Sequence, residues 1–410
     1  MSGICALLNR SVSPILLGGL VSASWLQADL ATTLTGYFPG FSPEVVVKER
    51  FHQAGVPIDG RQPDCPQVHN DAFYGRLVRE GSMGLGESYM DGWWDATAVD
   101  GLIFRLLRTH LDEEATWTAP QALTWLYAHL FNPQTRDGSH KVIDLHYQLG
   151  SDLFQRMLDP TMTYSCGYWK DAKNLHEAQL AKYDLIARKL DLKPGMHVLD
   201  IGCGWGGFSK HIASKYGATV VGITLSEDQA QIARQRCKGL PVEIRLMDYR
   251  DVNSQFDRVV EIGMFEHVGP KNYRIFMETV HRNLKEGGLF MLHTIGGNQS
   301  TPGGDAWIDR YIFPGGHLPS IVQIGKSIEG LFVMEDWHNF GTDYDKTLMA
   351  WHQNFNAHWP EIQASYPDPF FRMWNYYLLS CAGAFRARAI QLWQVVLSKG
   401  GVLGGYESVR

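Results

Sequence analysis

The chain has 410 residues, of which 45% are hydrophobic and 20% are charged. This length and composition are typical of a folded protein with one large core or two unequal domains. The formal net charge of -6 argues against a nucleic-acid binder, because such proteins normally carry a strongly basic domain or stripe. We therefore expect no nucleic-acid partner.

The cysteines are widely spaced and form no CxxC pair. This pattern predicts free thiols in a reducing cytoplasm, and it lacks the ligand rhythm of a zinc ribbon, so no metal site is expected. The cysteines are Cys5, Cys65, Cys166, Cys203, Cys237 and Cys381.

The candidate membrane segment runs from Val12 to Leu34. Proline, glycine and polar residues interrupt it well short of the roughly 20 apolar residues that a membrane span needs. A signal peptide would need a basic start, and Arg10 alone is a weak one. We therefore expect no integral membrane anchor.

The N-terminal third divides into segments of different character. The first 42 residues have few charges and no clear period, and they end in a Gly/Pro-rich stretch that predicts an unstructured extension. A mixed pattern follows, with an apolar helical run from Pro120 to Phe131 and a polar, turn-rich boundary at 132–138. The predicted division is an extension at 1–42, a small N-terminal domain at 43–136, a larger domain at 137–400 and a tail at 401–410.

The larger domain shows the pattern of an α/β fold. From Lys193 onward, apolar β-branched runs alternate with amphipathic helical patterns, which indicates a parallel sheet with crossover helices. A capping box at Ser226 predicts a helix to about Cys237, and Pro270 suits the first turn of a helix ending near Leu284. The predicted strands are His197–Ile201, Thr219–Thr224, Val242–Met247, Arg258–Gly263, Leu289–Thr294 and a last one at Ile390–Leu397.

A glycine-rich turn follows the first of these strands. Gly202, Gly204 and Gly206 stand where a ligand could approach the backbone closely, since no Cβ intervenes. A dinucleotide site expects a different glycine spacing and an acid about twenty residues further on, whereas the second strand ends in Thr224. The spacing resembles the S-adenosylmethionine loop of class I methyltransferases; a dehydrogenase and a purely structural turn remain as alternatives.

Longer motifs, in order along the chain, resemble the cyclopropane fatty acid synthase family. The resemblance extends from about Phe73 to about Lys399, and the stretch from Gly84 to Trp94 is similar to the N-terminal domain of the bacterial phospholipid-acting branch, which the mycolic acid branch lacks. The motifs are Tyr164-Ser-Cys-Gly-Tyr-Trp169, Gly263-Met-Phe-Glu-His-Val-Gly269, Leu292-His-Thr-Ile-Gly296, Tyr311-Ile-Phe-Pro-Gly315, Met334-Glu-Asp-Trp-His338 and Cys381-Ala-Gly-Ala-Phe-Arg386.

The resemblance implies a fold and an activity. The fold would be a class I methyltransferase Rossmann-like sheet with a smaller, lipid-associated N-terminal domain. The activity would be methyl transfer from S-adenosylmethionine to the cis double bond of phospholipid acyl chains, followed by closure of a cyclopropane ring with bicarbonate as proton acceptor. The expected partners are a phospholipid bilayer and a second copy of the chain, with a cytoplasmic protein bound peripherally to the inner face of the membrane.

The resemblance also implies two sets of site residues. Cys166 and Ile295 are expected to hold bicarbonate through their backbone amides, and Glu266 beside an anion should be protonated or accept the anion's own proton. The residues expected at S-adenosylmethionine are Tyr164, Ser165, Gly202, Gly204, Thr224, Leu225, Gln229, Asp248, Tyr249 and Gly263. The residues expected at bicarbonate are Cys166, Glu266, His293, Ile295 and Tyr344.

Simpler interpretations compete with these assignments. Without the family, Cys166 would be read as a small buried hydrophobe, His293 as a satisfied core histidine and Glu266 as a helix anchor. A zinc site made by the three is disfavoured because the ligands lack short spacing. A methyltransferase that closes no ring and a non-catalytic lipid-binding protein are the competing functions. Two positions depart from the family pattern: Glu261 is a charge within a strand, and Gly167 replaces the commoner alanine.

Overall fold

The computed structural model describes residues 42–109, 150–301 and 303–410. The extension predicted for residues 1–42 lies outside this part except for its last residue. The helical run predicted at 120–131 and the boundary predicted at 132–138 also lie outside it.

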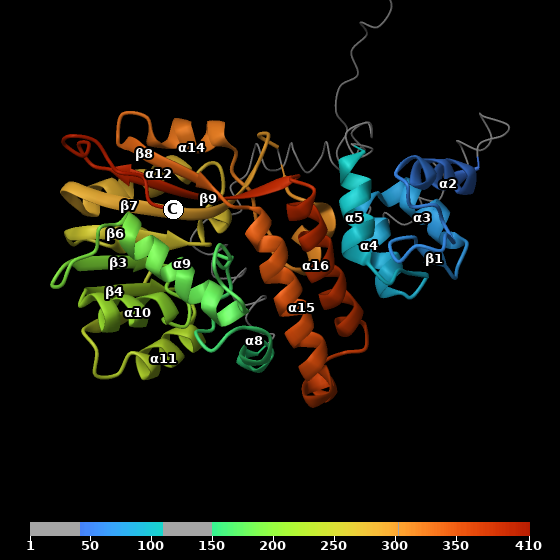
Figure 1. The fold of residues 1–410 in the computed structure, drawn as a ribbon, viewed down its shortest axis with the longest axis horizontal. Coiled ribbons are helices and arrows are strands. Elements are labelled where there is room, and N and C mark those ends of the chain that lie inside the picture. The colour runs from blue at the N-terminus through green and yellow to red at the C-terminus, as the bar shows by residue number, and fades with distance from the viewer. Residues whose placement is uncertain (1–41, 110–149, 302) are drawn as a thin grey trace, which may run out of the picture.

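The described residues form a sheet of seven strands in the order β5-β4-β3-β6-β7-β9-β8. Strands β3 to β7 are parallel neighbours, and β9 runs antiparallel between β7 and β8. The predicted α/β fold is therefore confirmed (Figure 1). The strands are β3 (His197–Ile201), β4 (Thr219–Thr224), β5 (Val242–Leu246), β6 (Phe256–Ile262), β7 (Leu284–Gly297), β8 (Val333–Asn339) and β9 (Ile390–Ser398).

Helices cover both faces of the sheet, and two long helices flank it at one side. Ser226 caps α11 as predicted, since its hydroxyl accepts a hydrogen bond from the Gln229 amide at 3.3 Å. The helix predicted from Pro270 begins three residues later, at Tyr273. The helices are α8 (Ser151–Met157), α9 (Leu175–Lys189), α10 (Gly207–Tyr216), α11 (Glu227–Arg236), α12 (Tyr273–Asn283), α13 (Ala306–Tyr311), α14 (Ile321–Ile328), α15 (Thr342–Ile362) and α16 (Pro369–Arg386), with 3-10 turns η1 (Tyr249–Asp251), η2 (Phe265–His267) and η3 (Gln363–Ser365).

Alternate side chains of the central strands supply two separate cores. Leu199 and Ile201 pack with residues of α12 and α14 on one face. Val198 packs with residues of α9 and α10 on the other face. This alternation follows from the two-residue period of a strand, and burial on both faces is the reason that the parallel strands read as continuous apolar runs.

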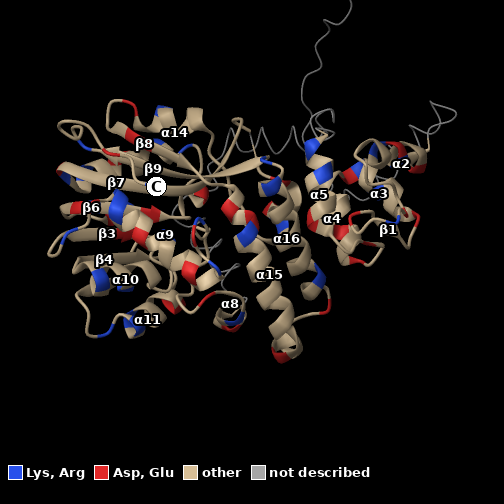
Figure 2. Ribbon diagram, viewed as in Figure 1, with Lys and Arg blue, Asp and Glu red and all other residues tan. Residues whose placement is uncertain are grey.

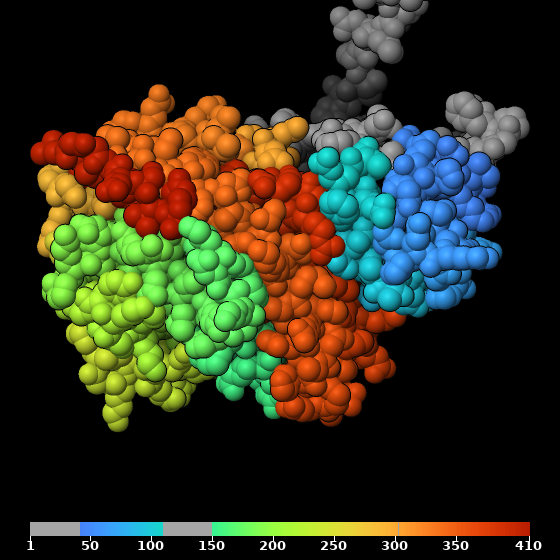
Figure 3. Space-filling model, in the orientation of Figure 1, coloured from blue at the N-terminus to red at the C-terminus, as the bar shows by residue number. Residues whose placement is uncertain are grey.

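The N-terminal part is small and mainly helical, and it packs against α13 and α16 (Figures 1 and 3). Its apolar residues belong to the same buried cluster as those two helices. The contact between α5 and α16 is close, because a Cβ added at Gly383 would lie 2.5 Å from the Asp100 carbonyl oxygen. The elements are α2 (Pro43–Gln53), β1 (Gln67–Val68), α3 (Ala72–Glu80), α4 (Ser82–Met90), β2 (Trp94–Asp95) and α5 (Val99–Arg108).

Residues 401–410, predicted as a tail, lie against α9 and β8. The Tyr406 hydroxyl donates to the Lys189 carbonyl oxygen at 2.9 Å. The guanidinium of Arg410 pairs with the buried carboxylate of Asp336 at 2.5 Å. The division of the chain at residue 136 stays a prediction.

Charges of both signs are interspersed over the helices (Figure 2). Among the described residues, no helix combines the length and the apolar character that crossing a membrane requires.

Candidate active site

A cavity of about 1550 Å³ opens at the carboxyl ends of the parallel strands. This is the edge at which open α/β sheets bind their ligands. Its wall starts at the glycine-rich turn after β3 and extends to apolar residues of α5 such as Leu106. All ten residues expected at S-adenosylmethionine line it, and of the five expected at bicarbonate, Glu266, Ile295 and Tyr344 do.

The glycine-rich turn joins β3 to α10. Its backbone conformation is unfavourable for residues that carry a side chain. Gly202, Gly204 and Gly206 have φ values of 76°, 53° and 77°, which only glycine adopts readily. A Cβ at Gly204 would meet nothing within 4 Å, so this residue borders open cavity. A Cβ at Gly202 would lie 3.0 Å from the Cβ of Met264. The turn thus leaves its backbone accessible to a ligand.

The end of β4 carries hydrogen-bonding groups in place of an acid. The Thr224 hydroxyl donates to Oε1 of Gln229 at 2.7 Å, and both side chains are buried. This bond leaves the amide nitrogen of Gln229 as a donor at the cavity wall. Such a donor can bind ribose hydroxyl groups, which is the role that the family resemblance implies for Gln229.

The turn after β5 carries Asp248, whose carboxylate is paired with Arg250. The carboxylate of Asp248 accepts hydrogen bonds from the backbone amide of Arg250 at 2.9 Å and from its guanidinium at 2.6 Å. Beside it, burial raises the pKa of Tyr249 to about 12, so this phenol stays neutral. The pair can contribute a flat ring and a fixed carboxylate to an adenine pocket.

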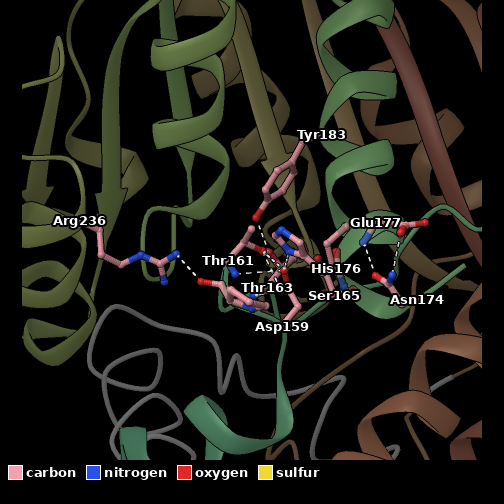
Figure 4. A network of polar contacts seen from close by, with 11 residues as sticks. Asp159, Thr161, Thr163, Ser165, Asn174, His176, Glu177, Tyr183 and Arg236 are labelled. Atoms are coloured by element: carbon pink, nitrogen blue, oxygen red, sulfur yellow. Dashed lines mark hydrogen bonds and ion pairs between the residues drawn. The ribbon is translucent and has the colours of Figure 1, made fainter. Parts of the chain in front are cut away.

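The segment that carries Tyr164 and Ser165 is fixed by a network of polar contacts (Figure 4). The Asp159 carboxylate accepts hydrogen bonds from the backbone amides of Thr161 at 3.0 Å and Thr163 at 3.2 Å. The backbone oxygen of Ser165 accepts from the Gln179 side chain at 2.8 Å. These contacts hold Ser165 at the cavity wall before any ligand arrives.

Tyr164 lies within an aromatic wall. Its hydroxyl is 2.9 Å from that of Tyr377, and its ring centroid is 5.1 Å from that of Trp351. Tyr344 stacks on Phe385 with centroids 4.5 Å apart. Burial raises the pKa of both Tyr344 and Tyr377 well above that of a free phenol, so both rings remain neutral donors.

Glu266 is buried in the turn after β6, and its two oxygens have different surroundings. Oε1 accepts a hydrogen bond from the Ile295 amide at 2.6 Å. Oε2 is buried and has no hydrogen-bond partner within the described residues. Burial raises the pKa of Glu266 to about 7. The Ile295 amide, expected to hold an anion directly, here orients Glu266 instead.

His293 is buried within β7 as a neutral imidazole. The side-chain amide of Gln394 donates to its Nδ1 at 3.2 Å, which places the ring proton on Nε2. That Nε2 is buried and has no partner among the residues that the structure describes. Burial lowers the pKa of His293 well below its usual value. A buried N–H without an acceptor is costly, so this position is suited to an acceptor supplied from outside the chain.

Cys166 is fully buried, and burial raises the pKa of its thiol well above the usual range. Its Sγ lies 3.2 Å from the Gly167 carbonyl oxygen. Neither Cys166 nor His293 contributes to the cavity lining. Cys166 and Glu266 both lie near Tyr344, since a negative charge on either would raise the pKa of that phenol.

Several residues line the cavity that were not predicted as site residues, among them Tyr376, which the sequence pattern indicated as core. His267 lines the cavity with a pKa lowered to about 4 by burial, and Trp307, Tyr376 and Phe385 add aromatic surface. Gln394 was not predicted as a site residue because it lies in an apolar strand. A polar residue within that apolar run is the feature of the sequence that could have indicated it. In the described ranges, no group of three or more His, Cys, Asp or Glu side chains is arranged to hold a metal ion.

The strand order with its antiparallel β9, and the glycine turn at the carboxyl edge, define a class I methyltransferase fold. The family model described as mycolic acid cyclopropane synthetase matches residues 134–395. The chain belongs to this family.

Three relatives illustrate the range of the family. The chain is 54% identical to the cyclopropane-fatty-acyl-phospholipid synthase of Escherichia coli (strain K12) over 87% of this chain and 93% of the relative. It is 33% identical to the tuberculostearic acid methyltransferase of Mycobacterium tuberculosis over 85% of this chain and 86% of the relative. The crystal structure of a mycolic acid cyclopropane synthase complexed with SAH and CTAB matches at 34% identity with a TM-score of 0.60, covering 63% of this chain and 98% of that one.

Proposed function

We propose that the chain is a cyclopropane-fatty-acyl-phospholipid synthase. It transfers the methyl group of S-adenosylmethionine to a cis double bond of a phospholipid acyl chain and closes a cyclopropane ring. The relative from Escherichia coli, which carries that name and matches over most of both chains, supports the substrate class.

One observation carries the proposal: a single cavity joins three kinds of surface. The cofactor loop at Gly204 lies at one end, Glu266 and Tyr344 lie along the wall, and apolar side chains of α5 such as Leu107 lie at the far end. Its volume of about 1550 Å³ exceeds the range of about 300–1,000 Å³ that is usual for small-ligand pockets. A methyl donor and a long acyl chain could occupy it together.

The chemistry requires what this cavity supplies. An isolated alkene is a weak nucleophile, so it must be held in line with the sulfonium methyl group in a dry site. Formation of the new carbon–carbon bond releases S-adenosylhomocysteine and leaves a positive charge on the acyl chain. The faces of Tyr164, Tyr344 and Phe385 can stabilise that charge. Loss of a proton from the added methyl group then allows the second ring bond to form.

The proton needs an acceptor, which bicarbonate would supply when bound. The residues fit such an ion, because Oε2 of the lining residue Glu266 has no partner within the described residues, and Nε2 of His293, which does not itself line the cavity, has none either. Glu266, with its pKa of about 7, can carry a proton and donate it to an anion oxygen, while the Ile295 amide keeps its carboxyl group oriented. The Tyr344 hydroxyl is a third donor at the cavity wall.

The proposal includes where the protein works. A cytoplasmic homodimer bound peripherally to the inner face of the membrane would give the α5 end of the cavity access to acyl chains. The family resemblance suggests the dimer, and the apolar lining at Ile103 and Leu106 supports the lipid end.

Labelled methyl transfer tests the proposal. Phosphatidylglycerol vesicles with cis-monounsaturated chains should gain label from S-adenosylmethionine in their acyl chains. Matched vesicles with saturated chains should gain none, because they offer no π electrons to the methyl group. Equal labelling of both vesicles, or label confined to the head group, would contradict it.

A methyltransferase that branches the chain without closing a ring is the second candidate. The match to the tuberculostearic acid methyltransferase favours it over more distant functions. The donor atoms of Glu266, His293 and Tyr344 favour ring closure instead, because they suit a bound proton acceptor. The structure of the lipid product separates the two.

A further inference from the structure

Lys182 of α9 is a cation buried in the protein interior behind the methyl-donor end of the cavity. Its side chain has no exposed surface, and its Nζ donates a hydrogen bond to the Ser165 hydroxyl oxygen at 2.7 Å. Burying an ammonium group is costly unless a specific interaction compensates for it.

The hydrogen bond from Lys182 fixes the direction of the Ser165 hydroxyl. Because the Ser165 oxygen accepts from Lys182, its own O–H is available to donate elsewhere. Ser165 is held by the Gln179 side chain through its backbone oxygen, and it lines the cavity. Its Cβ would lie 3.6 Å from a Cβ placed on Gly263, so it stands beside the strand end that borders the cofactor loop. The open direction for the O–H is therefore the cavity.

Lys182 is the buried basic group at this end of the cavity, and acidic groups lie near it. Burial lowers the pKa of Lys182 to about 7, and the nearby Cys166, Asp159 and Asp200 oppose this shift. The neighbouring His293 is neutral. Asp200 is held by the Ser209 hydroxyl at 2.6 Å, and burial raises its pKa to about 6. A ligand carboxylate near Lys182 would raise the pKa of this lysine. The protonated side chain of Lys182 can only donate hydrogen bonds, so it suits an acceptor.

We propose that Lys182 is a positioning residue that aims the Ser165 hydroxyl at the carboxylate of the methionine part of the methyl donor. Lys182 also contributes the positive charge that this carboxylate needs in a buried site. The inference rests on the proposed function, since it takes S-adenosylmethionine as the ligand of this cavity.

A ligand comparison tests it on the full-length chain. Lys182→Met and wild type would be titrated calorimetrically with S-adenosylhomocysteine and with decarboxylated S-adenosylhomocysteine, which differ by the carboxylate alone. The variant should bind S-adenosylhomocysteine about tenfold more weakly, the loss of one charge-assisted hydrogen bond. It should bind the decarboxylated ligand within about twofold of wild type. Equal losses for the two ligands, or no loss for either, would overturn the proposal.

Two further variants complete the test, one at Ser165 and one control at Lys189. Ser165→Ala removes the hydroxyl oxygen alone and should show the same carboxylate-dependent loss; an unchanged affinity would overturn the proposal even if Lys182→Met does not fold. Lys189→Met removes the other buried lysine of α9, which contacts His338 at 3.1 Å and not Ser165. It should alter the unfolding temperature while affecting the two ligands alike. A wild-type chain that bound neither ligand would refute the proposed function, a result distinct from the equal losses described above.

Discussion

Two buried carboxyl groups lie near the turn after β6: Glu261 at the end of the strand and Glu266 in the turn itself. Glu261 is fully buried, and its Oε1 accepts hydrogen bonds from the backbone amides of Met264 and Phe265. Those amides belong to the turn that carries Glu266. Burial, followed by repulsion from Glu266, raises the pKa of Glu261 well above 4.5. Glu261 is therefore a neutral acid that braces the turn.

A raised pKa has a definite sign for stability. The protonated form is favoured in the folded state, so the free energy of unfolding falls as pH rises above 4.5, the usual pKa of this carboxyl, and continues to fall up to the raised folded pKa. Glu261→Gln keeps the Oε1 acceptor and removes the ionisation. Urea unfolding at pH 5.5 and 8.5 should show a smaller loss for the variant, by more than about 1 kcal/mol. A variant with the same pH slope as wild type would contradict this account.

Glu266 and His293 are expected to affect turnover and not donor binding. Glu266→Gln and His293→Gln should each lower kcat by about a hundredfold or more, the usual scale for losing acid–base assistance. The affinity for S-adenosylhomocysteine should stay within about threefold of wild type, because neither residue belongs to the donor end of the cavity. Steady-state kinetics and calorimetry measure the two effects. Glu278→Gln, an exposed α12 carboxylate paired with Arg274, serves as the matched control.

At the scale of elements, the sequence predicted those strands whose position follows from the pattern of buried residues. The six expected strands are present because apolar β-branched runs report burial on both faces. Strand β8 was missed because it lies at the sheet edge, where Val333 and Met334 are exposed and charged residues follow them. The roles of Lys182 and Gln394 could not be predicted either, because periodicity shows that a position is buried but not which partner satisfies it.

The contact between α5 and α16 joins the N-terminal helices to the cavity. Gly383 allows the close approach, and the Arg386 guanidinium pairs with the Asp100 carboxylate at 2.7 Å. Since α5 also lines the cavity, a displaced α5 would disturb the acyl-chain end and leave the cofactor loop intact.

Gly383→Val tests this contact. The variant should unfold at a lower temperature by several degrees, as overpacking costs about 1–3 kcal/mol. It should also lose more activity on vesicles than affinity for S-adenosylhomocysteine. Gly325→Ala is the control, since an added Cβ there meets nothing within 4 Å. Parallel losses of activity and cofactor affinity would show that α5 does not act through the acyl-chain end.

At the scale of the whole molecule, the fold brings a methyl-donor site and an apolar channel into one cavity. The sheet supplies the donor site at its carboxyl edge, and the N-terminal helices together with α16 supply the apolar end. Residues as far apart in sequence as Leu106 and Ser380 meet in this wall. A family member that lacked the N-terminal helices would retain the donor site and lose part of the channel.

The structure of the lipid product tests the central claim most directly. Wild-type protein would be incubated with S-adenosylmethionine and vesicles of a cis-monounsaturated phosphatidylglycerol, and the extracted lipid would be analysed by NMR and mass spectrometry. We predict a gain of one methylene per reacted chain, loss of the olefinic signal and the appearance of upfield cyclopropane protons. A methyl-branched chain without a ring, or a methylated head group, would contradict the claim that this cavity closes a cyclopropane ring.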